Sequence, residues 1–229
     1  MLFLNNFFFK IYLFTITFLS FAPSNFKGVP LQNKEIKYLA LGDSYTIGEG
    51  LNKNNRWPIQ LSNMLKDYLK IDVKTKIIAK TGFTTSELID SIGKLNLSSD
   101  FDYVSLLIGV NNQYQRSTIT DFEKEFSFLL IKAISFAKKS ENVFVLSIPD
   151  WGITPFGLKS GRNNIGIEIN NYNDIIKKIC LKKGIFFIDI TEISRKAIYN
   201  QDLLSKDSLH PSKKMYKMWA DKAYKHLIN

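Results

Sequence analysis

Short apolar stretches of β-type residues alternate with longer amphipathic stretches along most of this chain of 229 residues. Strands are predicted at positions 36–41, 73–79, 103–108, 143–148 and 185–190, and helices at positions 57–69, 85–95, 121–139, 165–183 and 212–227. Regular alternation of strands and helices produces a parallel sheet, because each helix carries the chain back to the start of the next strand. The sequence therefore predicts an α/β fold, a three-layer α/β/α sandwich around a five-stranded parallel sheet.

The first 26 residues differ from the rest, because positions 2–22 are almost wholly apolar and carry one charged side chain, Lys10. An apolar region of this kind is typical of a signal peptide, and it also approaches the roughly 20 residues that span a bilayer. We therefore expect residues 1–26 to be a signal peptide or an N-terminal membrane anchor, and residues 27–229 to form a single domain. The protein is accordingly expected to be periplasmic or secreted, or else attached to the membrane through residues 1–26.

The composition does not favour a nucleic-acid-binding protein, although the formal net charge is +10. The lysines are scattered along the chain, and only four of the 31 basic residues are arginine, whose planar fork is preferred for phosphate and base recognition. A solvated, lysine-rich surface is the better interpretation, so no nucleic-acid partner is expected. The single cysteine, Cys180, excludes an intramolecular disulfide and is predicted to be a core residue.

Two short motifs near the ends of the predicted domain contain the groups that a serine hydrolase needs. A Gly-Asp-Ser sequence ends at Ser44, just after the first predicted strand, where a hydroxyl can project into a cleft. Asp207 lies three residues before His210, and Pro211 disfavours helical geometry at the histidine. This pattern predicts Ser44 as the nucleophile, His210 as the base that takes its proton, and Asp207 as the group that orients the imidazole.

Two other acids, Asp150 and Asp189, end predicted strands and are alternatives for orienting the histidine. Asp207 is preferred because the local sequence ties it to His210. The second histidine, His226, has no acid at the same spacing and is predicted to be a surface residue near the end of the last helix.

Acyl transfer also needs hydrogen-bond donors for the oxyanion that develops in the transition state. The candidates are the backbone N–H groups of Ser44 and Gly82 and the side-chain amide of Asn111, each of which follows a different predicted strand. Glycine and asparagine are also ordinary turn residues, so each position taken alone is equally consistent with turn chemistry.

Taken together, the blocks around Ser44, Gly82, Asn111 and His210 resemble the SGNH family of hydrolases, also called GDSL lipases or esterases. The resemblance covers nearly the whole predicted domain and keeps the family order of the four blocks. It implies a flavodoxin-like fold, an oxyanion hole formed by Ser44, Gly82 and Asn111, and catalysis without a metal or a cofactor. The third block usually reads Gly-x-Asn-Asp, and here Asn112 replaces the aspartate, which we expect to affect the local loop or the pocket more than activity.

The expected function is therefore hydrolysis of carboxylic esters through an acyl-enzyme on Ser44. Asn112, Tyr114 and Trp151 are candidates for the substrate rim, a combination of polar and aromatic groups that suits sugar faces and short acyl chains. No apolar segment after the leader is long enough for a lipid-binding lid, which favours short-chain or acetyl esters of small molecules or carbohydrates. A lysophospholipase or thioesterase of the same family is one alternative, and a catalytically silent glycan-binding surface protein is another.

Overall fold

The computed structural model describes residues 35–228, so the leader predicted at residues 1–26 lies outside the described part. Five parallel strands form one sheet in the order β2-β1-β3-β4-β5. This is the strand order of flavodoxin-like folds, in which ligands bind at the switch point between β1 and β3. The strands are β1 (Ile36–Gly42), β2 (Val73–Ala79), β3 (Tyr103–Leu107), β4 (Val143–Leu146) and β5 (Phe186–Ile188).

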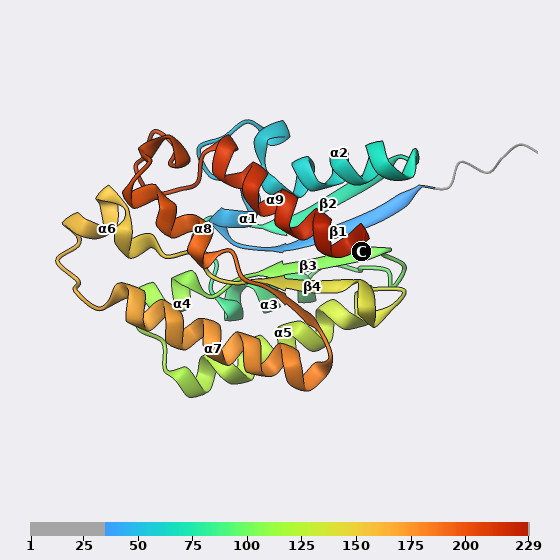
Figure 1. The fold of residues 1–229 in the computed structure, drawn as a ribbon. Coiled ribbons are helices and arrows are strands. Elements are labelled where there is room, and N and C mark those ends of the chain that lie inside the picture. The colour runs from blue at the N-terminus through green and yellow to red at the C-terminus, as the bar shows by residue number, and fades with distance from the viewer. Residues whose placement is uncertain (1–34, 229) are drawn as a thin grey trace, which may run out of the picture. The chain divides into compact units, whose positions relative to one another are not determined.

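Helices cover both faces of the sheet (Figure 1), which confirms the predicted three-layer α/β/α sandwich. Helices α2 and α9 pack together on one face, and α3, α5 and α7 cover the other. The long helices are α2 (Trp57–Leu69), α3 (Thr85–Gly93), α5 (Ile119–Phe136), α7 (Ile165–Lys183) and α9 (Lys213–Ile228). Within residues 35–228, no helix is both long enough and apolar enough to cross a bilayer.

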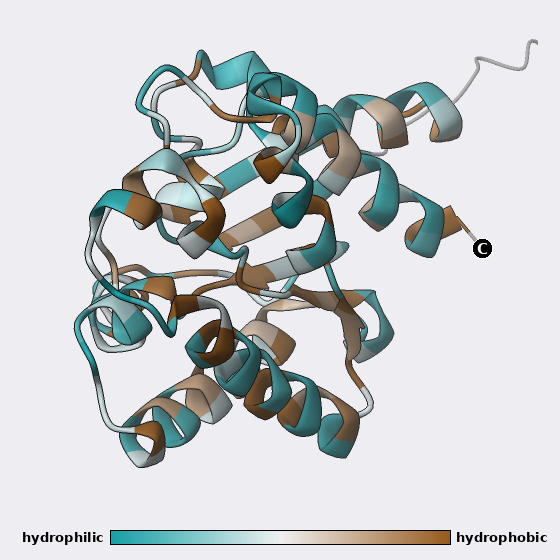
Figure 2. Ribbon diagram, turned by 60° about the vertical axis from the view of Figure 1, so that its left-hand side comes forward, coloured by the Kyte–Doolittle hydropathy of each residue, from teal (hydrophilic) through white to brown (hydrophobic). Residues whose placement is uncertain are grey.

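The central strands are apolar and buried, as a parallel sheet covered on both faces requires. In Figure 2 hydrophobic residues lie along the strands and on the inward helix faces, whereas hydrophilic residues lie outside. Tyr38 of β1 is fully buried, and its hydroxyl forms a hydrogen bond of 2.8 Å with the hydroxyl of Ser105 on β3. Cys180 is also fully buried, as predicted.

The last two predicted strands are shorter in the structure because side chains replace the backbone ladder at their carboxyl ends. The backbone N–H of Ser147 still donates to the Ile188 carbonyl at 3.0 Å, but that of Ile190 donates to the Ser147 hydroxyl at 2.7 Å. The N–H of Ile148 donates to the side chain of Asn173 at 2.7 Å. Strands β4 and β5 therefore end where polar side chains take over the backbone hydrogen bonds.

Four short helices were not predicted, because a helix of four or five residues is too short to show helical periodicity. They are α1 (Ser44–Ile47), α4 (Val110–Tyr114), α6 (Pro155–Lys159) and α8 (Thr191–Arg195). The chain also contains the 3-10 turns η1 (Lys53–Asn55), η2 (Ser140–Asn142), η3 (Trp151–Ile153), η4 (Lys196–Ile198) and η5 (Gln201–Leu203). Helices α1 and α4 carry the predicted residues Ser44 and Asn111, so the missed elements lie where function was expected.

The end of β1 lies very close to its neighbours. Gly42 pairs with Ala79 of β2 on one side and with Leu107 of β3 on the other. A Cβ atom at Gly42 would lie 2.2 Å from the hydroxyl of Thr46 and 2.3 Å from the carbonyl oxygen of Leu107. Both distances are shorter than real contacts, so glycine is required where the chain turns from β1 into α1.

We predict that Gly42→Ala lowers the free energy of unfolding by on the order of 2 kcal/mol, because the extra methyl group displaces the β3 backbone or Thr46. Gly93→Ala is the matched control, since a Cβ there meets no heavy atom within 4 Å and alanine is the better helix former. Thermal melting followed by circular dichroism measures both variants. Equal melting temperatures for the two variants would contradict the close packing at Gly42.

Candidate active site

A cavity of about 190 Å³ lies at the carboxyl edge of the sheet, at the switch point between β1 and β3. The predicted residues Ser44, Gly82, Asn111 and His210 all line this cavity, although they come from four separate parts of the chain. The remaining wall is formed by Tyr45, Thr81, Val110, Tyr114, Trp151, Phe156 and Leu209. The structure thus brings the four predicted blocks together at one site.

Ser44 is the first residue of α1 and is 5% exposed. The residue that caps this helix is Asp43, whose side chain accepts a hydrogen bond of 3.0 Å from the backbone N–H of Tyr45. The helix ends after one turn at Gly48, which has a left-handed φ of 72°. The backbone N–H of Ser44 lies in the first turn of a helix, where N–H groups have no intrahelical acceptor.

Asp207 and His210 lie in a compact loop between η5 and α9. The backbone N–H of Ser205 donates to the His210 carbonyl at 2.7 Å, and that of Ser208 donates to the Ser205 carbonyl at 3.0 Å. Oδ2 of Asp207 lies 2.6 Å from Nδ1 of His210. The acid therefore holds one ring nitrogen, which leaves Nε2 as the nitrogen available to a second group.

The other carboxylate oxygen of Asp207 accepts three hydrogen bonds from its own loop. The donors are the Ser205 hydroxyl at 2.7 Å and the backbone N–H groups of Leu209 and His210, each at 2.9 Å. Partial burial by itself raises the pKa of Asp207, but these hydrogen bonds and the His210 ring outweigh it and lower the pKa to about 2. The carboxylate is therefore ionised at neutral pH and can balance a positive charge on the imidazole.

The ring of His210 belongs to a series of aromatic contacts between α1 and α9. Its centroid lies 5.6 Å from that of Tyr45, which lies 6.1 Å from Trp219, which in turn lies 5.1 Å from Tyr216. His210 is only 9% exposed. Because Tyr45 adjoins Ser44 in the chain, this packing fixes the histidine ring relative to the serine.

Asn111 and Asn112 both connect α4 to the segment that follows β2. The Asn111 amide donates to the Phe83 carbonyl at 2.8 Å, which leaves its second N–H for a ligand in the cavity. Asn112 is 2% exposed and does not line the cavity, because its amide accepts from the Thr85 N–H at 3.0 Å and donates to the Thr85 hydroxyl at 2.7 Å. This corrects the expectation that Asn112 forms part of the substrate rim.

The outer wall of the cavity consists of three aromatic rings. The Trp151 indole N–H donates to the side-chain oxygen of Gln113 at 2.8 Å. The centroid of the indole ring lies 5.5 Å from that of the Tyr114 ring and 6.0 Å from that of the Phe156 ring. Trp151 is buried, whereas Tyr114 is 50% and Phe156 is 42% exposed. Tyr114 and Phe156 therefore form the rim, and Trp151 forms the wall behind them.

Gln113 and Phe156 were not among the predicted site residues, and neither was Ser205. Gln113 and Phe156 lie in helices too short to show periodicity, and Ser205 lies in a loop, so spacing does not distinguish them from surface residues. The role of Gln113 depends on a contact with a distant segment, its bond to the indole, whereas Ser205 contacts Asp207 in its own loop.

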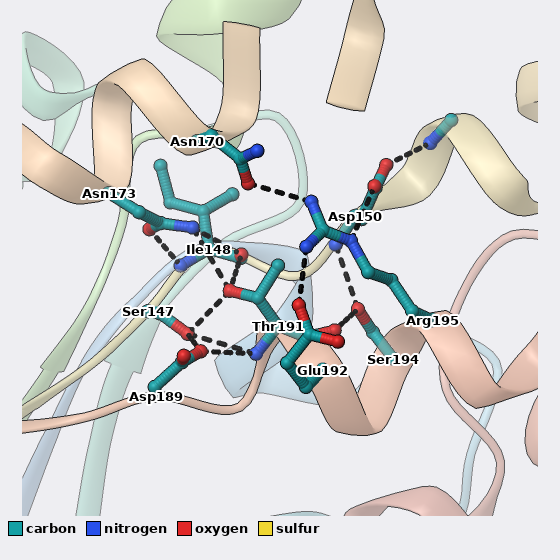
Figure 3. A network of polar contacts seen from close by, with 11 residues as sticks. Ser147, Ile148, Asp150, Asn170, Asn173, Asp189, Thr191, Glu192, Ser194 and Arg195 are labelled. Carbon is teal, nitrogen blue, oxygen red and sulfur yellow. Dashed lines mark hydrogen bonds and ion pairs between the residues drawn. The ribbon is translucent and has the colours of Figure 1, made fainter. Parts of the chain in front are cut away.

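A polar network holds Asp150, the residue before Trp151, against α8 (Figure 3). The backbone N–H of Asp150 donates to the Ser194 hydroxyl at 2.9 Å, and its carboxylate accepts from the Gly152 N–H at 2.9 Å. These contacts connect the start of η3 to α8. They fix the backbone of the residues on either side of Trp151.

The two alternative acids are used elsewhere. Asp150 accepts a hydrogen bond of 3.0 Å from Nε of Arg195, and Asp189 accepts one of 2.9 Å from the first backbone N–H of α8. Asp207 is therefore the acid that contacts His210, in agreement with the preference drawn from the sequence.

His226 lies in the last turn of α9, as predicted, but it is partly buried. Its ring stacks on that of Phe186 on the edge strand β5, with centroids 3.3 Å apart. Burial lowers the pKa of His226. His226 does not line the cavity.

Among residues 35–228, no three His, Cys, Asp or Glu side chains gather into a group that would ligate a metal ion.

Asp43, which precedes the serine, is fully buried. One carboxylate oxygen caps α1, and the other has no hydrogen-bond partner among the described residues. Burial raises the pKa of Asp43 to about 7, and the hydrogen bond from the Tyr45 N–H offsets this only in part. The folded protein therefore keeps a proton on Asp43 at pH values where the unfolded chain has lost it.

This raised pKa makes the stability depend on pH in a defined direction. The stabilisation of the fold by the protonated Asp43 carboxyl is complete below the ordinary pKa of 3.8 and is lost as the pH rises through the folded-state pKa of about 7. Asparagine caps a helix equally well and does not titrate, so we predict that the wild-type melting temperature falls relative to that of Asp43→Asn between about pH 5 and pH 8. Asp90→Asn, which changes an exposed acid in α3, should follow the wild type. Parallel wild-type and Asp43→Asn curves would contradict the raised pKa.

A serine at a strand–helix junction, a histidine held by a carboxylate, and amide donors around one small cavity are the components of a serine hydrolase site. Residues 40–218 match the model of the GDSL-like lipase/acylhydrolase family, and the chain belongs to this family, as its sequence resemblance indicated. It is accordingly a carboxylic ester hydrolase. No curated protein matches the sequence.

Solved structures of the same fold include three esterases or lipases of bacterial or metagenomic origin. A lipase from a goat rumen metagenome has a TM-score of 0.68 and 19% identity, over 83% of this chain and 97% of that one. An acetylxylan esterase from Geobacillus stearothermophilus has a TM-score of 0.67 and 15% identity, over 84% and 94%. A member of the lipolytic G-D-S-L family from Veillonella parvula has a TM-score of 0.63 and 18% identity, over 83% and 97%. At these identities, the similarity establishes the fold.

Proposed function

We propose that this protein is a serine esterase that removes short-chain acyl or acetyl groups through an acyl-enzyme on Ser44. His210 takes the proton from the Ser44 hydroxyl as the oxygen attacks the ester carbonyl, and then gives it to the leaving alcohol. Asp207 holds Nδ1 of the imidazole and balances its positive charge. Water then attacks the acyl-enzyme, with His210 again acting as the base. The observation that carries this proposal is the 2.6 Å contact between Asp207 and His210 beside the cavity that Ser44 lines.

The proposed oxyanion hole consists of the backbone N–H groups of Ser44 and Gly82 and the second N–H of the Asn111 amide. Gly82 has a left-handed φ of 87° in a turn closed by a hydrogen bond of 3.2 Å from the Phe83 N–H to the Lys80 carbonyl. A Cβ at Gly82 would meet no heavy atom within 4 Å, so the backbone there is open to a ligand.

The size of the cavity supports a small acyl group. Its volume of about 190 Å³ is below the roughly 300–1,000 Å³ of sites that enclose drug-sized ligands. Trp151 forms the wall behind the rim, where Gln113 holds it through a hydrogen bond and Tyr114 and Phe156 flank it. A long acyl chain would need this wall to move.

A carbohydrate is the alcohol we propose for the natural ester. The half-exposed rings of Tyr114 and Phe156 at the rim suit the face of a sugar. The fold is shared with an esterase named for its action on acetylxylan, which also supports this choice. We further propose that the enzyme acts in the periplasm or outside the cell, on the basis of the apolar sequence at its N-terminus.

We predict that Ser44→Ala abolishes hydrolysis of p-nitrophenyl acetate and leaves the melting temperature nearly unchanged. Ser135→Ala, at an exposed position of α5, should retain full activity. Rates on p-nitrophenyl esters from acetate to decanoate test the acyl size, and the highest kcat/KM is expected on the shortest chains. A preference for long chains would indicate a lipid enzyme, whereas no Ser44-dependent turnover on any ester would favour a binding protein.

We predict that Asp207→Asn lowers kcat by about 10²–10⁴-fold with little change in KM, because the imidazole loses the group that fixes its tautomer and balances its charge. Asp202→Asn, an exposed neighbour in η5, is the matched control and should behave as the wild type. Steady-state kinetics on p-nitrophenyl acetate separates the two parameters. An effect confined to KM would show that Asp207 contributes to binding instead.

A further inference from the structure

A second groove adjoins the candidate active site and shares Tyr114 and Phe156 with it as walls. Its volume is about 440 Å³, and its remaining lining consists of Arg116, Lys159, Ser160 and Arg162. We call this the basic groove, because three of its six lining residues are cations and none is an acid. A substrate that extends past the aromatic rim of the active site enters the basic groove.

Arg162 is held rigidly at the boundary between the two sites. Its guanidinium donates to Glu168 at 2.6 Å and to the Tyr114 carbonyl at 3.1 Å. The same group lies 5.5 Å from the centroid of the Trp151 ring and 6.0 Å from that of Tyr114. With 16% of its side chain exposed, Arg162 is fixed beside the rim, with its charge paired to Glu168.

The other two cations of the basic groove are not neutralised within the described part of the chain. Glu168 forms an ion pair with Arg162, but neither Arg116 nor Lys159 forms one with any residue from 35 to 228. The groove thus carries two uncompensated positive charges next to the ester site. Such a field attracts anionic ligands and raises their rate of association.

The backbone of Arg116 adds a second, independent observation. Its φ is 59°, in the left-handed region, and it closes α4 with hydrogen bonds from its own N–H to the Gln113 carbonyl and from the Ser117 N–H to the Asn112 carbonyl. Glycine is the residue that usually occupies this capping position, because it has no Cβ to strain. The Arg116 backbone is therefore strained, and its side chain forms no hydrogen bond or ion pair with any described side chain.

A left-handed cap occupied by a long cation is not evidence of binding by itself. Lys70 has the same conformation after α2, with a φ of 56°, at the opposite edge of the sheet from the cavity. What distinguishes Arg116 is its place in the basic groove, where Arg162 and Lys159 also lie. Lys70 therefore provides the matched control for the strain and for the charge.

We infer that the basic groove binds an anionic substituent of the ester, a carboxylate, phosphate or sulfate group on the part of the substrate that extends beyond Tyr114 and Phe156. This inference rests on the proposed function and extends it by naming the substrate class, esters that carry a negative charge. The small cavity holds the acyl group or the scissile bond, the aromatic rim packs on the middle of the substrate, and Arg116, Lys159 and Arg162 bind its charged end.

The test uses two pairs of esters, each with an anionic and a neutral member of similar size. In the first pair, acetoxybenzoate and its neutral methyl ester, the anion carries its charge on the alcohol part of the ester. In the second pair, mono-p-nitrophenyl succinate and the neutral p-nitrophenyl butyrate, the anion carries its charge on the acyl part. The wild type is expected to favour the anionic member of at least one pair, after correction for alkaline hydrolysis rates. The preference should fall as salt is added, because salt screens exposed charges.

Arg116→Gly is expected to reduce the anionic preference in kcat/KM by about 3- to 10-fold, mainly through KM, and to leave the rate on neutral esters unchanged. Its melting temperature should stay the same or rise, because glycine suits the left-handed conformation, so a loss of preference will not reflect unfolding. Arg116→Lys should keep most of the preference, and Lys70→Gly should keep all of it. The same anionic preference in the wild type and Arg116→Gly, or none in the wild type, would overturn the inference.

Failure of the proposed function gives a different result. In that case no ester is hydrolysed in a Ser44-dependent manner, and binding takes the place of turnover as the measurement. Calorimetric titration of Ser44→Ala with acetoxybenzoate and with its methyl ester then tests the basic groove directly. Tighter binding of the anion that Arg116→Gly removes supports the groove, and equal binding of the two esters overturns it.

Discussion

The parallel pairing of β1 between β2 and β3 is the constraint on which the whole site depends. The three strands end level with one another, so the short segments that follow them emerge side by side at one edge of the sheet. The serine, the glycine and the asparagine of the site belong to those segments. The absence of a side chain at Gly42 allows this close arrangement, because the backbone of β3 and Thr46 occupy the space that a side chain would fill.

The acid and the histidine are organised in a different way. Their loop is held by its own hydrogen bonds, with the carboxylate of Asp207 as the common acceptor, and it needs no strand to shape it. It is joined to the serine through the rings of Tyr45 and Trp219 rather than through the sheet. The site therefore combines a part that the sheet positions with a part that aromatic packing positions, and the contact between His210 and Tyr45 is where the two meet.

The sequence predicts the sheet, the long helices and the residues of the four blocks because each has a local signature, either a periodicity or a short motif. It does not predict α1 or α4, which are too short for periodicity, or Gln113, whose role depends on an indole 38 residues away. Asn112 shows the same limit. From the sequence alone its amide could face the cavity or the protein interior, and the hydrogen bonds with Thr85 turn it inward. The raised pKa of Asp43 likewise follows from its complete burial in the folded protein, which the sequence does not reveal.

Helix α4 shows how this arrangement constrains the length of the chain. Asn111, Asn112 and Gln113 are consecutive, yet their side chains contact three different segments, those that follow β2, begin α3 and begin η3. Each residue turns the helix by about 100°, so a single insertion or deletion would point every one of these side chains toward the wrong partner. The contacts of these three residues therefore fix the length of this segment. Substitutions that alter substrate preference without moving the reacting groups are therefore expected in the segment between η3 and α7, which carries α6 and part of the rim but supplies none of those groups.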